Sequence, residues 1–325
     1  MAQPAEPTSP SSHVESRRAG ESPEALRARI DRLIGGLGGA AASAIGIVLL
    51  IVAVSAFQLA LPSIRTFGAD FLVSQDWDPI HARFGALPFL YGTVVTSAVA
   101  LALAVPVGIG MALFLSDLGP SALKRPVGTL MTLLAAVPSV VYGLWAALVL
   151  APLLRTTIEP ALEARFGALP FFRGPSVGVG LLCASLVLAV MVLPTIASVS
   201  REVLRAVPWE LREGALALGA TRWDVVRRVV LPHARAGLSG AVLLGFGRAA
   251  SEAMAVAMVV GSRPEIRGSL FAPGYTMSSV IANEFAESTG TLHVAALAEI
   301  GLLLFAVTLT INVAARMLVS RVRGA

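Results

Sequence analysis

Two charged residues, Arg248 and Glu252, interrupt an otherwise apolar stretch of the 325-residue sequence and stand four positions apart. On a helix this spacing places both side chains on one face, about one turn from each other. A charged side chain near the middle of a membrane-spanning helix costs about 3 kcal/mol or more, so such residues mark functional positions. Two interpretations are open: the pair neutralise each other inside a helix bundle, or they contact a substrate.

If they contact a substrate, the pair has the chemistry of an oxyanion site. A guanidinium group presents a planar fork that matches two oxygens of phosphate or sulfate. A neighbouring carboxylate repels a fully deprotonated anion, but it accepts a hydrogen bond from a protonated phosphate oxygen, which sulfate lacks at neutral pH. An Arg–Glu pair that touches its ligand therefore favours phosphate. Further polar candidates for the same route, with helix–helix hydrogen bonding as the alternative role, are Ser139, Tyr142, Thr195 and Ser251.

A second candidate site is the charged, amphipathic segment 201–235. We expect one helix over 208–218, because Pro208 suits a helix start and Gly219 accepts the left-handed conformation that ends one. A second helix is expected over about 222–232. The segment is thus predicted to be a helix-turn-helix projection that docks a partner, and the alternative is an ordinary helix pair lying on a surface.

The projection offers both polar and apolar side chains to a partner. Its expected polar contacts are Arg212, Glu213 and Arg222, and its expected apolar anchors are Leu216, Leu218 and Trp223. A spaced pattern runs through the segment as Glu-x-Ala-x3-Gly, followed by an aliphatic residue, one spacer, Leu and Pro. The residues of this pattern that we assign to docking are Glu213, Gly214, Ala215, Gly219, Ala220, Leu231 and Pro232.

These sites must be positioned by helices that cross a membrane. Of all residues 56% are hydrophobic and 14% are charged, against about 25% charged in a soluble domain. Charge-free runs cover 33–64, 84–116, 126–154 and 174–200. Two further apolar stretches, about 236–262 and 291–317, contain the pair above and Glu299, respectively. Each exceeds the roughly 20 residues that a helix needs to span the hydrocarbon core, so we predict an all-α membrane protein of six transmembrane helices.

The basic residues indicate how these helices are oriented. Seventeen of the arginines and lysines fall in the termini and the second and fourth connections, against seven in the alternate connections. Since basic residues accumulate on the cytoplasmic side, both termini are expected there. The predicted domains are a largely disordered cytoplasmic tail at 1–32, an anchor helix at 33–62, and a transmembrane domain at 84–319 with the cytoplasmic loop 201–235. Kinks are expected at Pro106, Pro138 and Pro194.

Several classes of function are disfavoured. The net charge is +5, but the basic residues alternate with apolar spans and form no continuous patch, which argues against nucleic acid. The sole lysine, Lys124, is not part of a P-loop. The sequence contains neither HExxH nor GxSxG, so an intramembrane hydrolase is not favoured. No histidines stand at metal-ligand spacing, and we assign no catalytic and no metal-binding residue.

One octapeptide, Ala-Arg-Phe-Gly-Ala-Leu-Pro-Phe, occurs at 82–89 and again at 164–171, each time just before a span. We interpret the two copies as convergent use of one interfacial turn. The alternative is that both copies form rim elements that touch an external partner.

The spaced pattern in segment 201–235 resembles the EAA loop of ABC importer permeases, although Gly214 stands where alanine is usual. The stretch from Gly245 to Gly261 resembles the fifth-span motif of phosphate-specific ABC importer permeases of the PstC type. The same resemblance extends to Phe84–Thr93, Val137–Trp145, Arg212–Thr221 and Phe271–Phe285.

This resemblance implies a MetI-like type I importer fold in the inner (cytoplasmic) cell membrane. It implies transport of inorganic phosphate by alternating access, with Arg248 lining the path. The implied partners are a homologous second permease (PstA-type), a dimer of ATPase subunits (PstB-type) that hold ATP and Mg, and an extracytoplasmic phosphate-binding protein (PstS-type). This chain itself is expected to bind no cofactor.

Two alternatives differ in what they require. A permease for sulfate or molybdate would keep the same architecture with another oxyanion. A proton-coupled secondary transporter would also use an intramembrane Arg–Glu pair, but it has no need of the EAA spacing.

Overall fold

The computed structural model describes residues 23–288 and 290–323, with side chains for 34–288, 290–314 and 317. The predicted tail therefore lies outside the described residues up to position 22. The chain divides into two compact units, Met1–Ser55 and Ala56–Ala325. Helix α1 (Pro23–Phe67) supplies the described part of the first unit, and nearly all of its side chains from 34 to 55 are exposed apolar groups.

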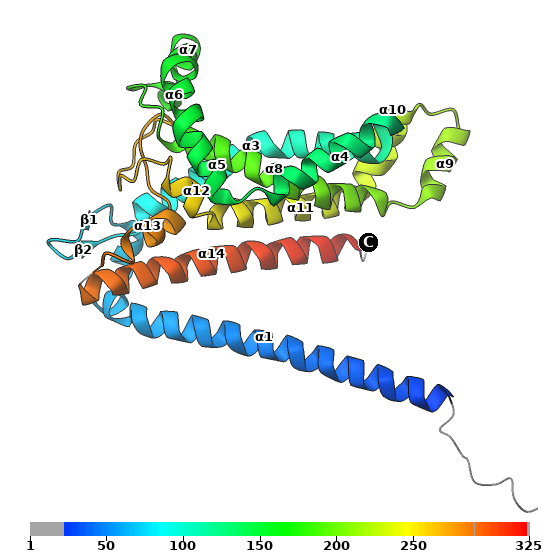
Figure 1. Cartoon of the computed structure of the whole chain (residues 1–325), viewed down its shortest axis with the longest axis horizontal. Helices are drawn as coiled ribbons and strands as arrows, with labels where there is room; N and C mark the ends of the chain where they lie inside the picture. Colours follow the sequence, from blue (N-terminus) through cyan, green and yellow to red (C-terminus); the bar gives the residue numbers. More distant parts are fainter. Residues whose placement is uncertain (1–22, 289, 324–325) are drawn as a thin grey trace, which may run out of the picture. The chain divides into compact units, whose positions relative to one another are not determined.

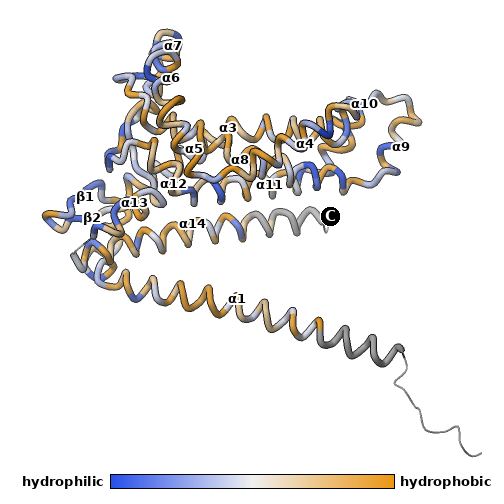
Figure 2. The backbone as a smooth tube through the Cα atoms, viewed as in Figure 1, coloured by the Kyte–Doolittle hydropathy of each residue, from blue (hydrophilic) through white to orange (hydrophobic). Residues whose placement is uncertain are grey.

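Six helical stretches of the described chain are long and apolar enough to cross a membrane, which confirms the predicted number. They are Ile34–Phe67, Leu87–Leu118, Ser139–Phe166, Leu181–Arg205, Arg222–Ser251 and Thr291–Ala314. Figure 2 shows the apolar residues along these helices and the hydrophilic ones gathered toward their ends. The limits of the third and fifth predicted spans are wrong at both ends, because these spans cover 139–166 instead of 126–154 and 222–251 instead of 236–262.

The second unit is a bundle of long helices with short elements at its two ends (Figure 1). Its long helices are α3 (Leu87–Leu113), α8 (Leu181–Arg205), α11 (Leu231–Ser251) and α14 (Thr291–Arg323). One end, here called the hairpin end, carries α2 (Asp70–Val73), the antiparallel strands β1 (Trp77–Asp78) and β2 (Arg83–Phe84), α12 (Met254–Ala257) and α13 (Met277–Glu284). The other end, the loop end, carries α9 (Trp209–Ala217) and α10 (Arg222–Val225).

The third predicted span is broken at Pro138. Helix α4 (Ser121–Ala136) ends there, and α5 (Ser139–Trp145) begins directly afterwards. Val137 is extended, with φ −68° and ψ 128°, because a residue that precedes proline is driven out of the helical region. The helix then continues through α6 (Ala151–Leu153) to α7 (Glu159–Phe166).

Prolines also explain four π-helical turns, at Phe114–Leu118, Ala146–Leu150, Leu154–Ile158 and Val226–Val230. Each turn ends two residues before a proline, and these prolines are Pro120, Pro152, Pro160 and Pro232. Proline lacks the backbone N–H and its ring displaces the carbonyl of the preceding turn, so the wider π turn accommodates Pro152, Pro160 and Pro232 while the helix continues. Before Pro120 the helix ends instead, and Gly119 is extended with φ −73° and ψ 147°. By contrast, Pro106 and Pro194 lie inside α3 and α8, which remain continuous.

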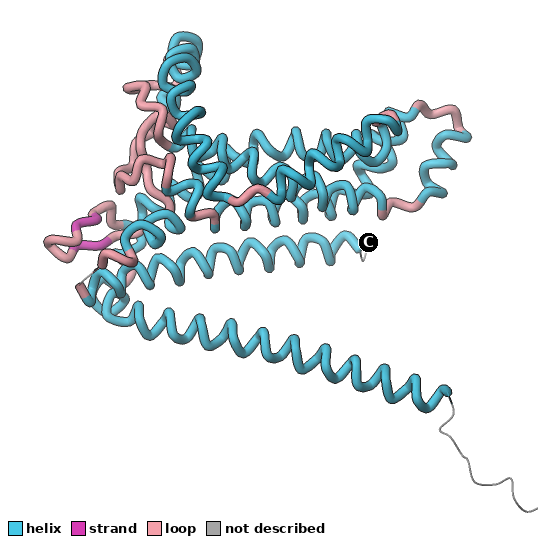
Figure 3. The backbone as a smooth tube through the Cα atoms, in the orientation of Figure 1, coloured by secondary structure: helices cyan, strands magenta, loops and turns pink. Residues whose placement is uncertain are grey.

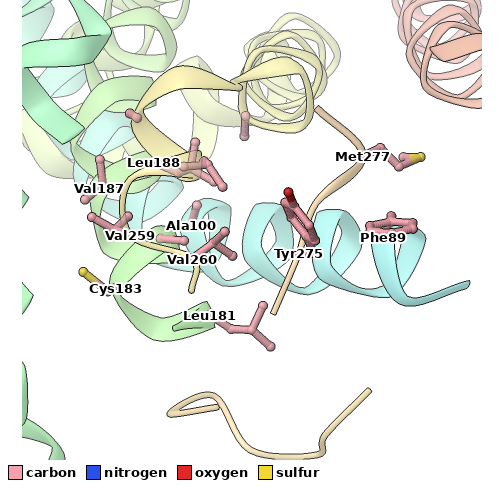
Figure 4. Packing of buried hydrophobic residues seen from close by; sticks show 14 of the residues in the cluster. Phe89, Ala100, Leu181, Cys183, Val187, Leu188, Val259, Val260, Tyr275 and Met277 are labelled. Atoms are coloured by element: carbon pink, nitrogen blue, oxygen red, sulfur yellow. The ribbon is translucent and has the colours of Figure 1, made fainter. Parts of the chain in front are cut away.

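The core forms where α3, α8 and α11 approach closely. Gly108 of α3 and Gly245 of α11 both face Ile196 of α8, and a Cβ atom at either glycine would lie within 3 Å of its side chain. Small residues at such positions let membrane helices pack backbone to backbone. Toward the hairpin end the core continues through larger side chains such as Phe89, Leu188 and Tyr275 (Figure 4).

Irregular backbone covers the start of α8 at the hairpin end (Figure 3). The amides of Gly180, Leu181 and Leu182 donate to the carbonyls of Val259, Ala272 and Leu270 at 2.9, 3.1 and 2.8 Å. These bonds satisfy the first N–H groups of α8, which have no partner within the helix. The segment between α12 and α13 is therefore an integral part of the bundle.

Candidate functional site

The first candidate site, at Arg248 and Glu252, is arranged differently from the prediction. Helix α11 ends at Ser251, and Glu252 is extended with φ −72° and ψ 119°. The two residues therefore do not share one helix face, and no ion pair joins them among the described side chains. Arg248 lies in the last turn of α11, at the hairpin end of the span, and not at its middle.

Glu252 is held by its own neighbours. Its Oε1 accepts a hydrogen bond from the amide of Ala255 at 3.4 Å, and its carbonyl accepts one from Ser278 Oγ at 2.7 Å. The carboxylate thus caps the short helix α12. The side chain of Arg248 is exposed and makes no hydrogen bond or ion pair with any described residue. The break in the helix separates the two charges and leaves the guanidinium free for a ligand.

The other predicted route residues come from three helices. Ser251 is exposed and donates to the carbonyl of Gly247 at 2.9 Å, next to Arg248. Ser139 begins α5, which packs against α12 so closely that a Cβ at Gly143 would lie 2.9 Å from the Cα of Ala255. The structure therefore brings α5 to the same end of the bundle as the helix break.

Thr195 is half-buried in α8, and its neighbours Val192 and Ile196 contact Gly245 of α11, about one turn before Arg248. Tyr142 uses its hydroxyl to bond the carbonyl of Leu134 at 2.7 Å, across the break between α4 and α5. Thr195 thus lies about one helical turn from the level of the arginine, toward the loop end, whereas the phenol of Tyr142 is already engaged in holding two helices.

The second candidate site, segment 201–235, contains the predicted first helix and turn. Pro208 is the extended residue that precedes α9, and Gly219 adopts φ +85° just after it. The prediction for the second helix is wrong at its end. It begins at Arg222, as expected, but it runs through Pro232 into α11 without interruption, because the π turn Val226–Val230 accommodates the proline.

Arg212 points inward and not toward a partner. Its Nη1 donates to the carboxylate of Asp117, at the end of the second span, and its Nη2 donates to the carbonyl of Leu204 at 2.6 Å. Burial lowers the pKa of Arg212 from its ordinary value, and the carboxylate of Asp117 supplies the counter-charge. Sequence reasoning missed this pair, since 95 positions separate the partners and only the placement of a lone Asp117 after an apolar run hinted at it.

The motif residues divide into an anchored set and an exposed set. Ala215, Ala220 and Leu231 pack on a small core that contains Leu113, Leu204 and Val230. The exposed members are Glu213, Gly214, Gly219 and Pro232. Glu213 accepts a hydrogen bond from Trp209 Nε1 at 2.6 Å.

The outer face of the segment presents large apolar side chains. Leu218 is 90% exposed and Trp223 is 55% exposed, and Leu216 is exposed as well. A hollow of about 440 Å³ lies beside them, lined in part by Ala215, Gly219 and Arg228. Exposed apolar side chains around a hollow are typical of an interaction surface.

Known proteins resemble this chain over most of its length. Residues 104–324 match the family described as "Binding-protein-dependent transport system inner membrane component". The chain is 45% identical over 287 residues to the phosphate transport system permease protein PstC of Mesorhizobium japonicum, covering 86% of this chain and 88% of that protein.

Two further relatives are also PstC proteins that match most of this chain. The PstC protein of Haemophilus influenzae is 45% identical over 80% of this chain and 84% of its own length. PstC 1 of Mycobacterium tuberculosis is 41% identical over 81% of this chain and 85% of its own length.

Proposed function

The chain belongs to the family of inner membrane components of binding-protein-dependent transport systems, and we propose on this premise that it is the phosphate-conducting permease subunit of an ABC importer. The names of its relatives support phosphate as the substrate. The observation that carries the proposal is the exposed, unpartnered guanidinium of Arg248 beside a helix break. An exposed guanidinium without a protein partner has its N–H donors available to the oxygens of an oxyanion.

The proposal is tested by phosphate uptake into vesicles that contain the assembled importer. Arg248→Gln keeps the size of the side chain and removes its charge. Uptake is expected to fall by roughly tenfold or more, because a charge-assisted hydrogen bond contributes about 1.5–3 kcal/mol. Arg125→Gln, at an exposed arginine of α4, is the matched control and keeps normal uptake. If Arg248→Gln lost assembly and uptake equally, its role would be structural.

Glu252 provides the test of phosphate against other oxyanions. Its carboxylate lies at the start of α12, where it accepts a hydrogen bond. A second acceptor position on the carboxylate can accept a hydrogen bond from the protonated oxygen of hydrogen phosphate. Glu252→Gln is therefore expected to weaken the preference for phosphate over sulfate by several-fold. Unchanged selectivity would mean that Glu252 serves only to cap the helix.

Segment 201–235 docks the ATPase subunits in this proposal, which assigns ATP and Mg to those partners and no ATP site to this chain. The exposed Leu218 and Trp223 supply the anchors, and Arg212 fixes α9 to the end of the second span. Leu218→Glu is expected to reduce co-purification of the ATPase and to abolish ATP-driven uptake, whereas membrane insertion stays intact. Normal uptake by this variant would refute docking at this surface.

The orientation of the chain in the membrane follows from the docking of the ATPase at segment 201–235. With the loop end in the cytoplasm, the hairpin end faces the extracytoplasmic binding protein, and the even number of spans places both termini in the cytoplasm. A second permease subunit completes the path. Membrane-impermeant labelling of single cysteines checks this topology, with label expected at position 80 from outside and at position 121, the exposed start of α4, only from inside.

A further inference from the structure

A cavity of about 190 Å³ lies between α4 and α8, toward the loop end of the bundle. Its wall from α8 includes Pro194, Ser198 and Arg201, and its wall from α4 includes Gly128 and Thr132. The cavity is separate from the hairpin end, where Arg248 lies. None of the residues assigned to the route or to docking lines it, although Thr195 is adjacent in sequence.

Arg201 is the charged group of this cavity. Its Nε is buried and has no hydrogen-bond partner, and the side chain forms no ion pair with any described residue. A buried N–H group that has no partner is unfavourable, although Arg201 as a whole is only half-buried. No carboxylate lines the cavity, and the acid at the end of the second span, Asp117, is already paired with Arg212. The guanidinium therefore has no counter-charge on the cavity wall, and an anion in the cavity would supply one.

The walls are shaped to leave room beside the guanidinium. A Cβ atom at Gly128 would meet no atom nearer than Arg201 Nη1, at 4.0 Å, so the space between the two residues is open. The volume equals that of roughly six water molecules at about 30 Å³ each. This is enough for one tetrahedral oxyanion together with part of its hydration shell.

Two hydroxyl groups accompany the charge. Thr132 Oγ1 donates to the carbonyl of Gly128 and Ser198 Oγ to that of Thr195, each at 3.1 Å. Both are exposed rotors that can turn to donate to a ligand instead. Thr195, Ser198 and Arg201 stand three residues apart, so they follow one face of α8 from the level of Gly245, about one turn from Arg248, toward the loop end.

We infer that this cavity is a second oxyanion site, in which Arg201 binds a phosphate group with the help of Thr132 and Ser198. The inference rests on the proposed function, because the orientation proposed there places this second phosphate contact on the cytoplasmic side of Arg248. The phosphate group is either the transported ion in passage or the headgroup of an inner-leaflet lipid. Both present phosphate oxygens that accept two parallel hydrogen bonds from a guanidinium group, so Arg201 can bind either one.

The experiment uses the complete importer in lipid nanodiscs and proteoliposomes. Variants Arg201→Gln and Arg201→Lys are compared with Arg125→Gln, which changes an exposed arginine of α4 outside the docking segment. Uptake of radiolabelled inorganic phosphate and native mass spectrometry of retained phospholipids are measured on each variant. Thr132→Val, at an exposed position, removes one predicted donor and keeps the charge, so it remains informative if Arg201→Gln does not assemble.

If the ion is the ligand, Arg201→Gln reduces uptake about tenfold or more, Arg201→Lys restores part of it and Thr132→Val costs a few-fold. If a lipid is the ligand, Arg201→Gln loses one retained phospholipid and uptake changes little. The inference is overturned if Arg201→Gln, or Thr132→Val in its place, changes neither quantity. If the variants change neither quantity while the wild-type complex takes up phosphate normally, only this second site is refuted. If the wild-type complex itself moves no phosphate, the proposed function is refuted.

Discussion

The octapeptide at 82–89 and its identical copy at 164–171 fold differently. In the first copy Arg83 and Phe84 form strand β2, and the last three residues begin α3. In the second copy the first three residues form the last turn of α7, and Pro170 and Phe171 begin a 3₁₀ turn. Only the helical start at Leu-Pro-Phe is common to both, because proline suits the first turn of a helix wherever it occurs.

The surroundings of the two copies differ in the same way. Phe84 and Phe89 are 3% and 0% exposed, whereas the equivalent Phe166 and Phe171 are 47% and 54% exposed. Strand β1 offers the first copy a pairing partner through Trp77, whose ring also contacts both phenylalanines. The second copy instead follows a helix that simply continues into it. Tertiary partners, and not the eight residues, decide between strand and helix.

The difference in burial argues against the alternative that both copies form a rim for an external partner. The phenylalanines of the first copy are buried in the bundle, so only the second copy has them free for such a contact. The comparison predicts that equal substitutions in the two copies have unequal effects.

The largest difference is expected for Phe89→Ala against Phe171→Ala. Phe89 packs edge-on against Trp77 and Tyr275, with ring centroids 4.7 and 5.4 Å away, and its removal leaves a cavity that costs about 3–5 kcal/mol. The exposed Phe171 is expected to cost less than about 0.5 kcal/mol. Denaturation of the purified protein in detergent measures both, and equal losses would contradict the assigned burial.

A smaller difference is expected for Phe84→Leu against Phe166→Leu. Phe84 stacks on His293 at 5.3 Å and meets Trp77 at 4.9 Å, and each aromatic contact contributes about 0.5–1.5 kcal/mol beyond its buried area. We expect a loss of about 1–2 kcal/mol for Phe84→Leu. Phe166 has one tilted contact, with Phe172 at 5.9 Å, so the matched change should cost less than half as much in the same denaturation assay.

Glycine substitutions at the first position of each copy are expected to have opposite signs. Ala82 adopts φ +51°, a left-handed conformation that costs a residue with a Cβ about 1 kcal/mol, and glycine relieves this cost. Ala164 lies inside α7, where glycine costs about 1 kcal/mol. The melting temperature should therefore stay level or rise for Ala82→Gly and fall for Ala164→Gly. A fall of equal size for both would show that position 82 is not strained.

The smallest expected effect concerns the turn before the first copy. The hydrogen bond from the His81 side chain, with bonds from the amides of His81 and Ile80, holds the pKa of Asp78 below its ordinary value. Because the folded-state pKa is lowered, the carboxylate stabilises the turn above its unfolded pKa of about 3.9. This support is lost as the pH falls through the folded value.

Hydrogen exchange of the Ile80 and His81 amides, corrected for the intrinsic rate, should accelerate at acidic pH in the wild type. Asp78→Asn removes the carboxylate and should make the corrected protection independent of pH. No such change is expected for the amides of 164–171, where no side-chain carboxylate caps the backbone. Protection that is independent of pH in the wild type would contradict the assigned role of Asp78.

The six spans were predictable from the sequence because each is an apolar run longer than the bilayer is thick. The ends of two of these spans, at Pro138 and Ser251, could not be predicted from the sequence. An apolar run looks the same whether it is one helix or two joined by an extended residue, so 126–154 and 236–262 both concealed a break. Prolines marked the possible places, but packing decided that Pro138 breaks a helix whereas Pro194 stays inside one.

By itself, the sequence determined the membrane as solvent, the number of helices and the loop pattern, since hydropathy and local propensities depend only on neighbours along the chain. The tertiary structure decided which charges meet. It paired Arg212 with Asp117, separated Glu252 from Arg248, and left Arg201 beside an open cavity. A charge in a membrane protein is stabilised by whatever partner the fold brings within a few ångströms, and that partner is rarely its neighbour in the sequence.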